Sequence, residues 1–143
     1  MIEAAMLVTS TDFRRLQACA NRGLRAARDA DAAEQLLDGL QRAVVVEASE
    51  LREPVVALDV PFAFRDLDSG RETTLTLVSP EESDPPAGRV SVLAPLGLAV
   101  LGRRTGSVSR WHSPAGLRRV RIERAAVDPD DADSGIDARA VTA

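Results

Sequence analysis

The sequence contains no lysine and no tyrosine, and these two absences exclude several kinds of enzyme. All 18 basic residues in the 143-residue chain are arginines, so it has neither a Schiff-base lysine nor the lysine of a phosphate-binding P-loop. The aromatic residues are three Phe and one Trp, too few to line an aromatic cofactor pocket. We therefore expect a protein that is not an enzyme and that uses no cofactor and no metal.

Cys19 is the single cysteine and His112 the single histidine. One cysteine cannot close an internal disulfide, which favours a reducing compartment, and His112 has no neighbouring Cys or His with which to bind a metal. The longest apolar run, residues 90–102, falls short of the roughly 18 residues of a membrane span. Residues 1–10 lack the basic cluster and apolar length of a signal peptide. We expect a cytoplasmic protein with no membrane segment.

The net charge of −4 is unevenly distributed along the chain. Residues 128–143 open with five aspartates between positions 128 and 137; they have little to bury and are predicted to be a disordered acidic tail. The block before them is basic and is either a solvated sheet face or a phosphate-binding surface. We favour the solvated face, because aromatic residues are not interleaved as single-strand binding requires. The block contains Arg103, Arg104, Arg110, Arg118, Arg119, Arg121 and Arg124.

Two amphipathic helices are predicted in the first third of the chain. Apolar residues recur every three or four positions through residues 11–27 and again through residues 32–46. Asp31 and Glu34 have the spacing of a capping box for the second helix. Two such helices joined by a few residues form an antiparallel hairpin, so residues 1–50 are predicted to be a helical hairpin, a short coiled coil.

After Pro54 the apolar period changes from about 3.6 to 2, which is typical of strands. Turn residues after the second and fifth predicted strands indicate two hairpins. A short helix is predicted from Pro95 to Leu101, ended by Gly102. Residues 51–127 are therefore predicted to be an antiparallel sheet packed by one short helix, which makes the chain an α+β protein. The predicted strands are residues 55–60, 61–67, 72–78, 89–94, 107–113 and 117–127.

The glycines and prolines of this second part carry a family pattern, which reads "GRVSVLAPLGLAVLG" from Gly88 to Gly102. Over about residues 50–127 the chain resembles the C-terminal domain of the bacterial Gre transcript-cleavage factors. The segment "DVPFAFRDLDSGRETTLTLVSPEESD" before the pattern is similar to the branch called regulator of nucleoside diphosphate kinase (Rnk). Two positions depart from the usual Gre pattern, since Ser107 replaces an acid and Ala94 replaces a serine. The matching positions are Gly88, Val90, Ser91, Pro95, Leu96, Gly97, Ala99, Val100, Leu101, Gly102, Gly106, Pro114 and Gly116.

The resemblance implies the fold shared with FK506-binding prolyl isomerases and implies bacterial RNA polymerase as the partner, with docking at the rim of its secondary channel. By the same resemblance the corner formed by Ala94, Pro95, Leu96 and Gly97 meets the polymerase, and we expect it to be an exposed apolar edge. The alternative is that Pro95 and Gly97 only turn the chain. A monomer is expected.

The resemblance also implies that the helical hairpin points into the channel. In cleavage-competent members, acids at its tip hold a second magnesium beside the active site of the polymerase. Here the tip acids are Asp29, Asp31 and Glu34, which either help to bind Mg²⁺ or cap and solvate a helix, the interpretation that we favour. A helix over residues 11–27 is roughly 25 Å long, shorter than the arm of a cleavage factor, so we expect no stimulation of cleavage.

Two other functions stay open at this stage. One is an arginine-rich module that binds nucleic acid directly, which a steep salt dependence would reveal. The other is a residual prolyl isomerase, in which Phe62 and Phe64 would line a proline pocket. We favour a core position for both rings, because the other aromatic residues of such a pocket are missing.

Overall fold

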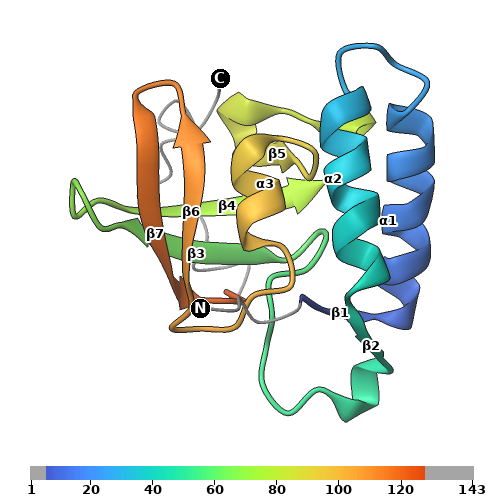
Figure 1. The fold of residues 1–143 in the computed structure, drawn as a ribbon. Coiled ribbons are helices and arrows are strands. Elements are labelled where there is room, and N and C mark those ends of the chain that lie inside the picture. Colours follow the sequence, from blue (N-terminus) through green and yellow to red (C-terminus); the bar gives the residue numbers. More distant parts are fainter. Residues whose placement is uncertain (1–5, 128–143) are drawn as a thin grey trace.

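A computed structural model describes residues 6–127, and the acidic tail predicted for residues 128–143 lies outside the described residues. The fold is α+β, as predicted, with the two longer helices beside a curled sheet (Figure 1). None of the helices in residues 6–127 has the length and apolar character needed to cross a membrane. The elements follow in the order β1 (Leu7–Thr9), α1 (Ser10–Gly23), α2 (Ala30–Gln41), β2 (Val44–Val46), η1 (Ala48–Glu50), β3 (Pro61–Asp66), β4 (Glu72–Val78), η2 (Pro80–Glu82), η3 (Pro85–Ala87), β5 (Arg89–Ser91), α3 (Pro95–Val100), β6 (Val108–Ser113) and β7 (Gly116–Arg124).

The helices α1 and α2 pack side by side and are joined by residues 24–29 (Figure 1). Thr9 caps α1, because its Oγ1 accepts a hydrogen bond from the N–H of Asp12 at 3.2 Å. The helix ends at Gly23, four residues earlier than predicted. The inner stripes follow the predicted spacing, with buried side chains at Leu16, Cys19, Ala20, Ala33, Leu36 and Leu40.

The end of the second predicted helix was wrong. α2 ends at Gln41, and residues 44–46 form strand β2, which runs parallel to β1. The N–H of Val44 donates to the carbonyl of Met6 at 2.9 Å. Three consecutive β-branched valines fit an extended strand better than a helix, and strand β1 supplies the partner.

The main sheet has the order β5-β4-β3-β7-β6. The two predicted hairpins, β3 with β4 and β6 with β7, are confirmed. The sheet is mixed and not wholly antiparallel, because β5 runs parallel to β4. The connection through residues 79–88 contains η2 and η3; it carries the chain back before β5 begins, as a parallel pairing requires.

Residues 55–60 are not the predicted strand and make only isolated bridges at Val55 and Leu58. Asp59 lies in the left-handed region at φ 66°, a conformation that interrupts an extended strand. The N–H of Leu58 donates to Oδ2 of Asp12 instead of to a neighbouring strand. This segment therefore links the start of α1 to the sheet.

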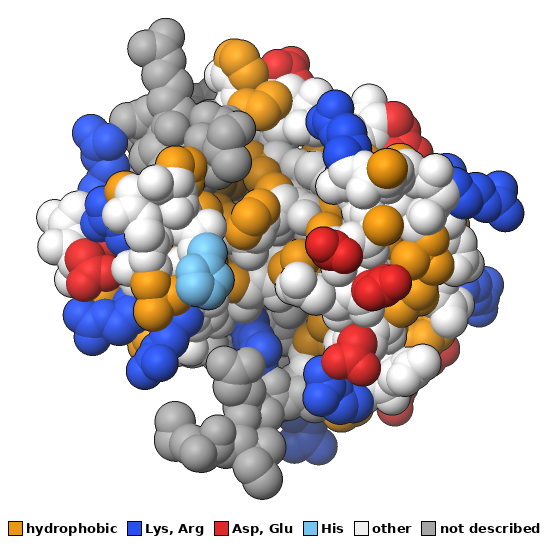
Figure 2. All heavy atoms as spheres, turned by 45° about the horizontal axis from the view of Figure 1, so that its top comes forward, with side chains coloured by type: hydrophobic (Ala, Val, Ile, Leu, Met, Phe, Trp, Pro, Cys, Tyr) orange, Lys and Arg blue, Asp and Glu red, His pale blue; other side chains and the backbone are white. Residues whose placement is uncertain are grey.

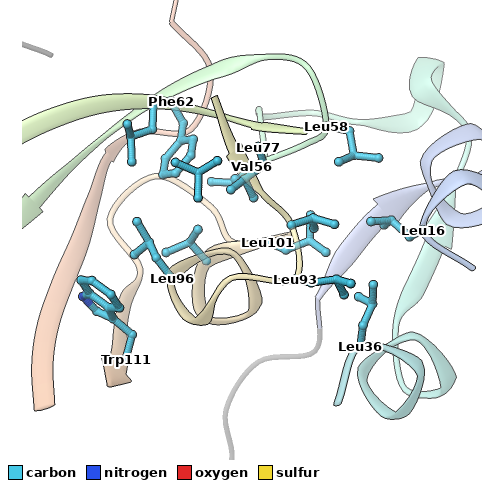
Figure 3. Close-up of a cluster of buried hydrophobic side chains, with 14 of the residues drawn as sticks. Leu16, Leu36, Val56, Leu58, Phe62, Leu77, Leu93, Leu96, Leu101 and Trp111 are labelled. Carbon is cyan, nitrogen blue, oxygen red and sulfur yellow. The ribbon is translucent and has the colours of Figure 1, made fainter. Parts of the chain in front are cut away.

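One hydrophobic core joins the helical pair to the sheet (Figure 3). Leu16 and Leu36 come from α1 and α2, Leu93 and Leu101 flank α3, and Phe62 comes from the sheet. The rings of Phe62 and Phe64 stack with centroids 5.7 Å apart, and both are buried, which confirms their core position. Because the core is shared, the helical pair has a fixed position against the sheet; the division at residues 50 and 51 stays a prediction.

Candidate docking cleft

An open cleft of about 940 Å³ lies between the helical pair and the sheet. One wall is formed by residues of the α1–α2 turn and the start of α2, between positions 28 and 35. The opposite wall is formed by α3 and by residues 110–112 of β6, and Pro80 and Pro85 close one end. Figure 2 looks onto this face, with acidic side chains in red on one side of the hollow and the histidine in pale blue on the other.

The orientation of the helical wall is fixed at both ends of α1. At its start, Asp12 accepts the hydrogen bond from Leu58, and burial raises the pKa of the Asp12 carboxyl. At its end, Nη2 of Arg22 lies 2.7 Å from Oε1 of Glu81 in η2. A Cβ on Gly23 would lie 3.0 Å from that of Ala33 and 3.1 Å from Cδ1 of Leu93, so the turn packs closely on the segment before α3.

The capping box predicted for Asp31 and Glu34 was wrong. α2 begins at Ala30 with Asp29 at the N-cap, and the Asp29 side chain makes no capping hydrogen bond. Asp31 lies inside the first turn, where a carboxylate interacts favourably with the helix dipole. Asp29 and Asp31 line the cleft, whereas Glu34 is exposed outside its lining.

The predicted docking corner is only partly at the surface. Pro95 is exposed and Ala94 half-buried, but Leu96 and Gly97 are buried and do not belong to an exposed apolar edge. The helical repeat explains the difference, because it turns the next two residues inward and brings Leu98 and Ala99 to the same side as Pro95. The cleft is lined by Ala94, Pro95, Leu98 and Ala99, and sequence reasoning missed the last two.

Most arginines of the basic block are paired with acids, as expected for a solvated sheet face. Glu123 of β7 accepts hydrogen bonds from Arg121 of the same strand and from Arg65 of β3. These hydrogen bonds lower the pKa of the Glu123 carboxyl to about 2. The backbone and side-chain N–H groups of Arg119 lower the pKa of Asp68. Further ion pairs join Arg104 to Glu53, Arg118 to Asp66 and Arg124 to Glu72.

Arg110 differs from those arginines, because its side chain forms no ion pair or hydrogen bond within residues 6–127. It is exposed on β6 and lines the cleft. Arg28 lines the opposite wall and is also unpaired within the described residues. The two guanidinium groups are therefore available to a partner from opposite sides of one hollow.

Cys19 and His112, which the sequence singled out, have ordinary surroundings. Cys19 is buried, with Sγ 3.5 Å from Oγ of Ser79, and His112 is exposed on β6. The described residues contain no group of three or more His, Cys, Asp or Glu side chains placed to bind a metal. Trp111 is 5% exposed at the cleft wall, and its Nε1–H has no acceptor within residues 6–127.

A small curled sheet enclosing one short helix, beside a pair of longer helices, is an architecture with known relatives. Residues 52–126 match the family model described as "Transcription elongation factor, GreA/GreB, C-term". The chain is 35% identical over 83 residues to transcription elongation factor GreA of Syntrophomonas wolfei, covering 58% of this chain and 52% of that protein. It is 33% identical over 102 residues to GreA of Chloroflexus aurantiacus, covering 66% and 65%.

Among solved structures, the prokaryotic transcription elongation factor GreA/GreB from Nitrosomonas europaea matches with a TM-score of 0.68 and 33% identity, over 83% of this chain and 97% of that one. The chain belongs to the GreA/GreB family of transcription elongation factors. Its matched part spans between about half and two thirds of the curated GreA proteins.

Proposed function

We propose that this protein binds bacterial RNA polymerase at the rim of its secondary channel and regulates transcription without stimulating transcript cleavage. The observation that carries the proposal is the Gre-family sheet, whose α3 corner is open to a partner at Ala94 and Pro95. We also propose that the chain is related to the Rnk branch and that its sheet part has the fold of the FK506-binding proteins. The sequence of residues 59–84, before the glycine and proline pattern, supports the placement near that branch.

The position of the tip acids supports the proposal that the protein does not stimulate cleavage. α1 has 14 residues, which corresponds to about 21 Å at 1.5 Å per residue. Asp29 and Asp31 line the same cleft as Pro95, so a protein docked through this corner keeps them close to the docking surface. An acid held at the rim cannot complete the octahedral ligand shell of a distant magnesium.

Direct binding to nucleic acid is the weaker candidate. Five of the seven arginines in the basic block have acidic partners on the same surface: Arg104, Arg118, Arg119, Arg121 and Arg124. Phosphate binding would compete with those ion pairs. A surface of alternating, mutually neutralised charges favours a protein partner over a polyanion.

The test is binding of the full chain to purified core RNA polymerase. We expect wild type to bind and Pro95→Asp to bind at least about tenfold more weakly, because a charge would be introduced at an apolar contact. Pro114→Asp is the matched control, since Pro114 is exposed in the β6–β7 turn outside the cleft. Circular dichroism checks that both variants are folded. A wild-type protein that does not bind, or equal affinities for the two variants, contradicts the proposal.

A further inference from the structure

Strand β6 forms one edge of the main sheet, and no strand among the described residues pairs with its outer side (Figure 1). The N–H of Ile122 donates to the carbonyl of Ser107 at 2.9 Å. In the antiparallel register of β6 with β7, the odd-numbered residues of β6 therefore direct their N–H and C=O groups toward β7. Those of Val108, Arg110 and His112 point outward, along an open edge. Such unpaired backbone groups can bind a further extended segment.

The side chains on this edge carry positive charge that is not neutralised. Arg110 and Arg119 are register partners on β6 and β7, and like charges directly opposite one another are destabilising. Arg119 pairs with Asp68 at 3.3 Å, whereas the Arg110 side chain has no partner within residues 6–127. A carboxylate beside Arg110 would offset the repulsion and accept a strong, charge-assisted hydrogen bond. The edge therefore suits an extended segment with acidic side chains.

The chain itself supplies an acidic segment that can reach this edge. Residues 128–143 contain five aspartates between positions 128 and 137, and they follow Val127, whose N–H donates to the carbonyl of Pro61 at the start of β3. Because β3 and β6 are both antiparallel to β7, they begin at the same end of the sheet. The two strands are separated by about 10 Å at the usual strand spacing, and an extended segment of this length spans up to about 50 Å.

The charges of the cleft favour the β6 side for such a segment. Residues 110–112 line one wall of the cleft, and Asp29 and Asp31 line the helical wall. The two aspartates next to Arg28 in the sequence would repel further carboxylates. Arg110, on the opposite wall, is therefore the better partner for an incoming acid.

We propose that residues 128–143 of this chain bind in extended form along the open edge of β6, where their aspartates pair with Arg110. The contact depends on backbone hydrogen bonds at positions 110 and 112 and on charge, because the segment has few large apolar residues to bury. It covers part of the cleft wall, so a partner that enters the cleft has to displace it. The contact itself does not rest on the proposed function.

Amide hydrogen exchange in the full chain, with no partner present, tests the contact. We expect the amides of Arg110 and His112 to exchange at least about tenfold more slowly than in an unstructured peptide of the same sequence. The amide of Val45 is the matched control, because in the parallel β1–β2 pair it points to the open outer edge of β2, and it should show little protection. Unprotected amides at positions 110 and 112 overturn the proposal.

Charge variants of the full chain show whether the aspartates hold the segment in place. Arg110→Gln should reduce the protection of the His112 amide at least about fivefold, and neutralising the acidic segment should do the same. Arg25→Gln is the control, because Arg25 is exposed, its side chain is unpaired within the described residues, and it lies outside the cleft lining. The amide of Trp111 points toward β7 and reports whether the sheet is intact. The neutralised variant replaces Asp128, Asp130, Asp131, Asp133 and Asp137 by asparagine.

The remaining outcomes are decided by these variants and by dilution. Protection at His112 that persists in the neutralised variant, or that Arg25→Gln reduces equally, overturns the proposal. A contact within one chain gives the same protection over about a tenfold range of protein concentration. Protection that falls on dilution means that the segment comes from a second copy, which also overturns the proposal. Because no polymerase is present, a failure of polymerase binding leaves these results unchanged.

Discussion

Gly97 is required because α3 lies so close to the backbone of residues 91 and 92 that no side chain fits between them. A Cβ at this position would lie 2.7 Å from the carbonyl oxygen of Val92 and 2.9 Å from that of Ser91. Both atoms belong to the backbone, so no side-chain rotation could relieve the contact. The sequence left open whether Gly97 serves docking or chain geometry; its burial and these contacts favour the second role, while Pro95 beside it remains exposed.

Replacing Gly97 by alanine should lower the free energy of unfolding by about 1–3 kcal/mol, the usual effect of overpacking. Gly39→Ala is the control, because its Cβ would meet only the flexible Cε of Met6, at 2.8 Å, and alanine stabilises a helix interior by about 0.5–1 kcal/mol relative to glycine. Urea denaturation measures both variants. Equal effects from the two substitutions would contradict the backbone contact.

Glu123 makes part of the stability dependent on pH. Hydrogen bonds from Arg121 and Arg65 lower its pKa from 4.5 to about 2. Because the pKa is lower in the folded state, this contribution is present above pH 4.5 and is lost as the pH falls toward 2. We expect Glu123→Gln to be less stable than wild type at pH 7 by about 1 kcal/mol, with a smaller difference at pH 3. Glu34→Gln, at an exposed residue with no ion pair within the described residues, should show no such convergence.

At the scale of elements, the apolar periodicity correctly predicted those features that depend on residues close together in the sequence. The stripes of both helices, the two hairpins and the short helix opened by Pro95 follow from spacing and turn residues. The errors occur where a distant partner decides the structure. Residues 44–46 became a strand because β1 lies beside them, and β5 runs parallel because of the path of residues 79–88.

The β1–β2 pair offers a matched test of burial. Val8 and Val45 are register partners, but Val8 is 3% exposed and Val45 is 43% exposed. Val8→Ala removes buried methyl groups and should lower the free energy of unfolding by about 2 kcal/mol. Val45→Ala should change it by less than about 0.5 kcal/mol. If chemical denaturation gives similar values for both variants, β1 is not part of the core as described.

At the scale of the molecule, the cleft could not be predicted from the sequence. The family pattern pointed to the corner at Ala94 and Pro95, and the tip acids were recognised separately. No local pattern in the sequence indicates that Asp29 and Pro95, which are far apart in the chain, line the same cleft. That arrangement depends on the shared core and on the packing of Gly23 against Leu93, which are tertiary contacts.

The arrangement leads to the prediction that this protein does not stimulate RNA cleavage by polymerase. Asp29 and Asp31 line the same cleft as the proposed docking corner, and α1, with 14 residues, extends only about 21 Å. The assay mixes stalled, backtracked elongation complexes with the protein and Mg²⁺ and follows shortening of the RNA. With this protein alone, we expect the RNA to be cleaved at the intrinsic rate of the polymerase. When a Gre cleavage factor is also present, we expect slower cleavage than with that factor alone, because both proteins would occupy the same channel rim.

The double variant Asp29→Ala with Asp31→Ala is the control for ligand chemistry. If these acids do not reach the catalytic magnesium, the double variant should compete with the added Gre factor as wild type does, since the corner at Pro95 is intact. Cleavage well above the intrinsic rate that disappears in the double variant would refute the prediction, because it would make the two aspartates magnesium ligands. Competition lost in Pro95→Asp but kept in the double variant would assign channel occupancy to the corner and not to the tip acids.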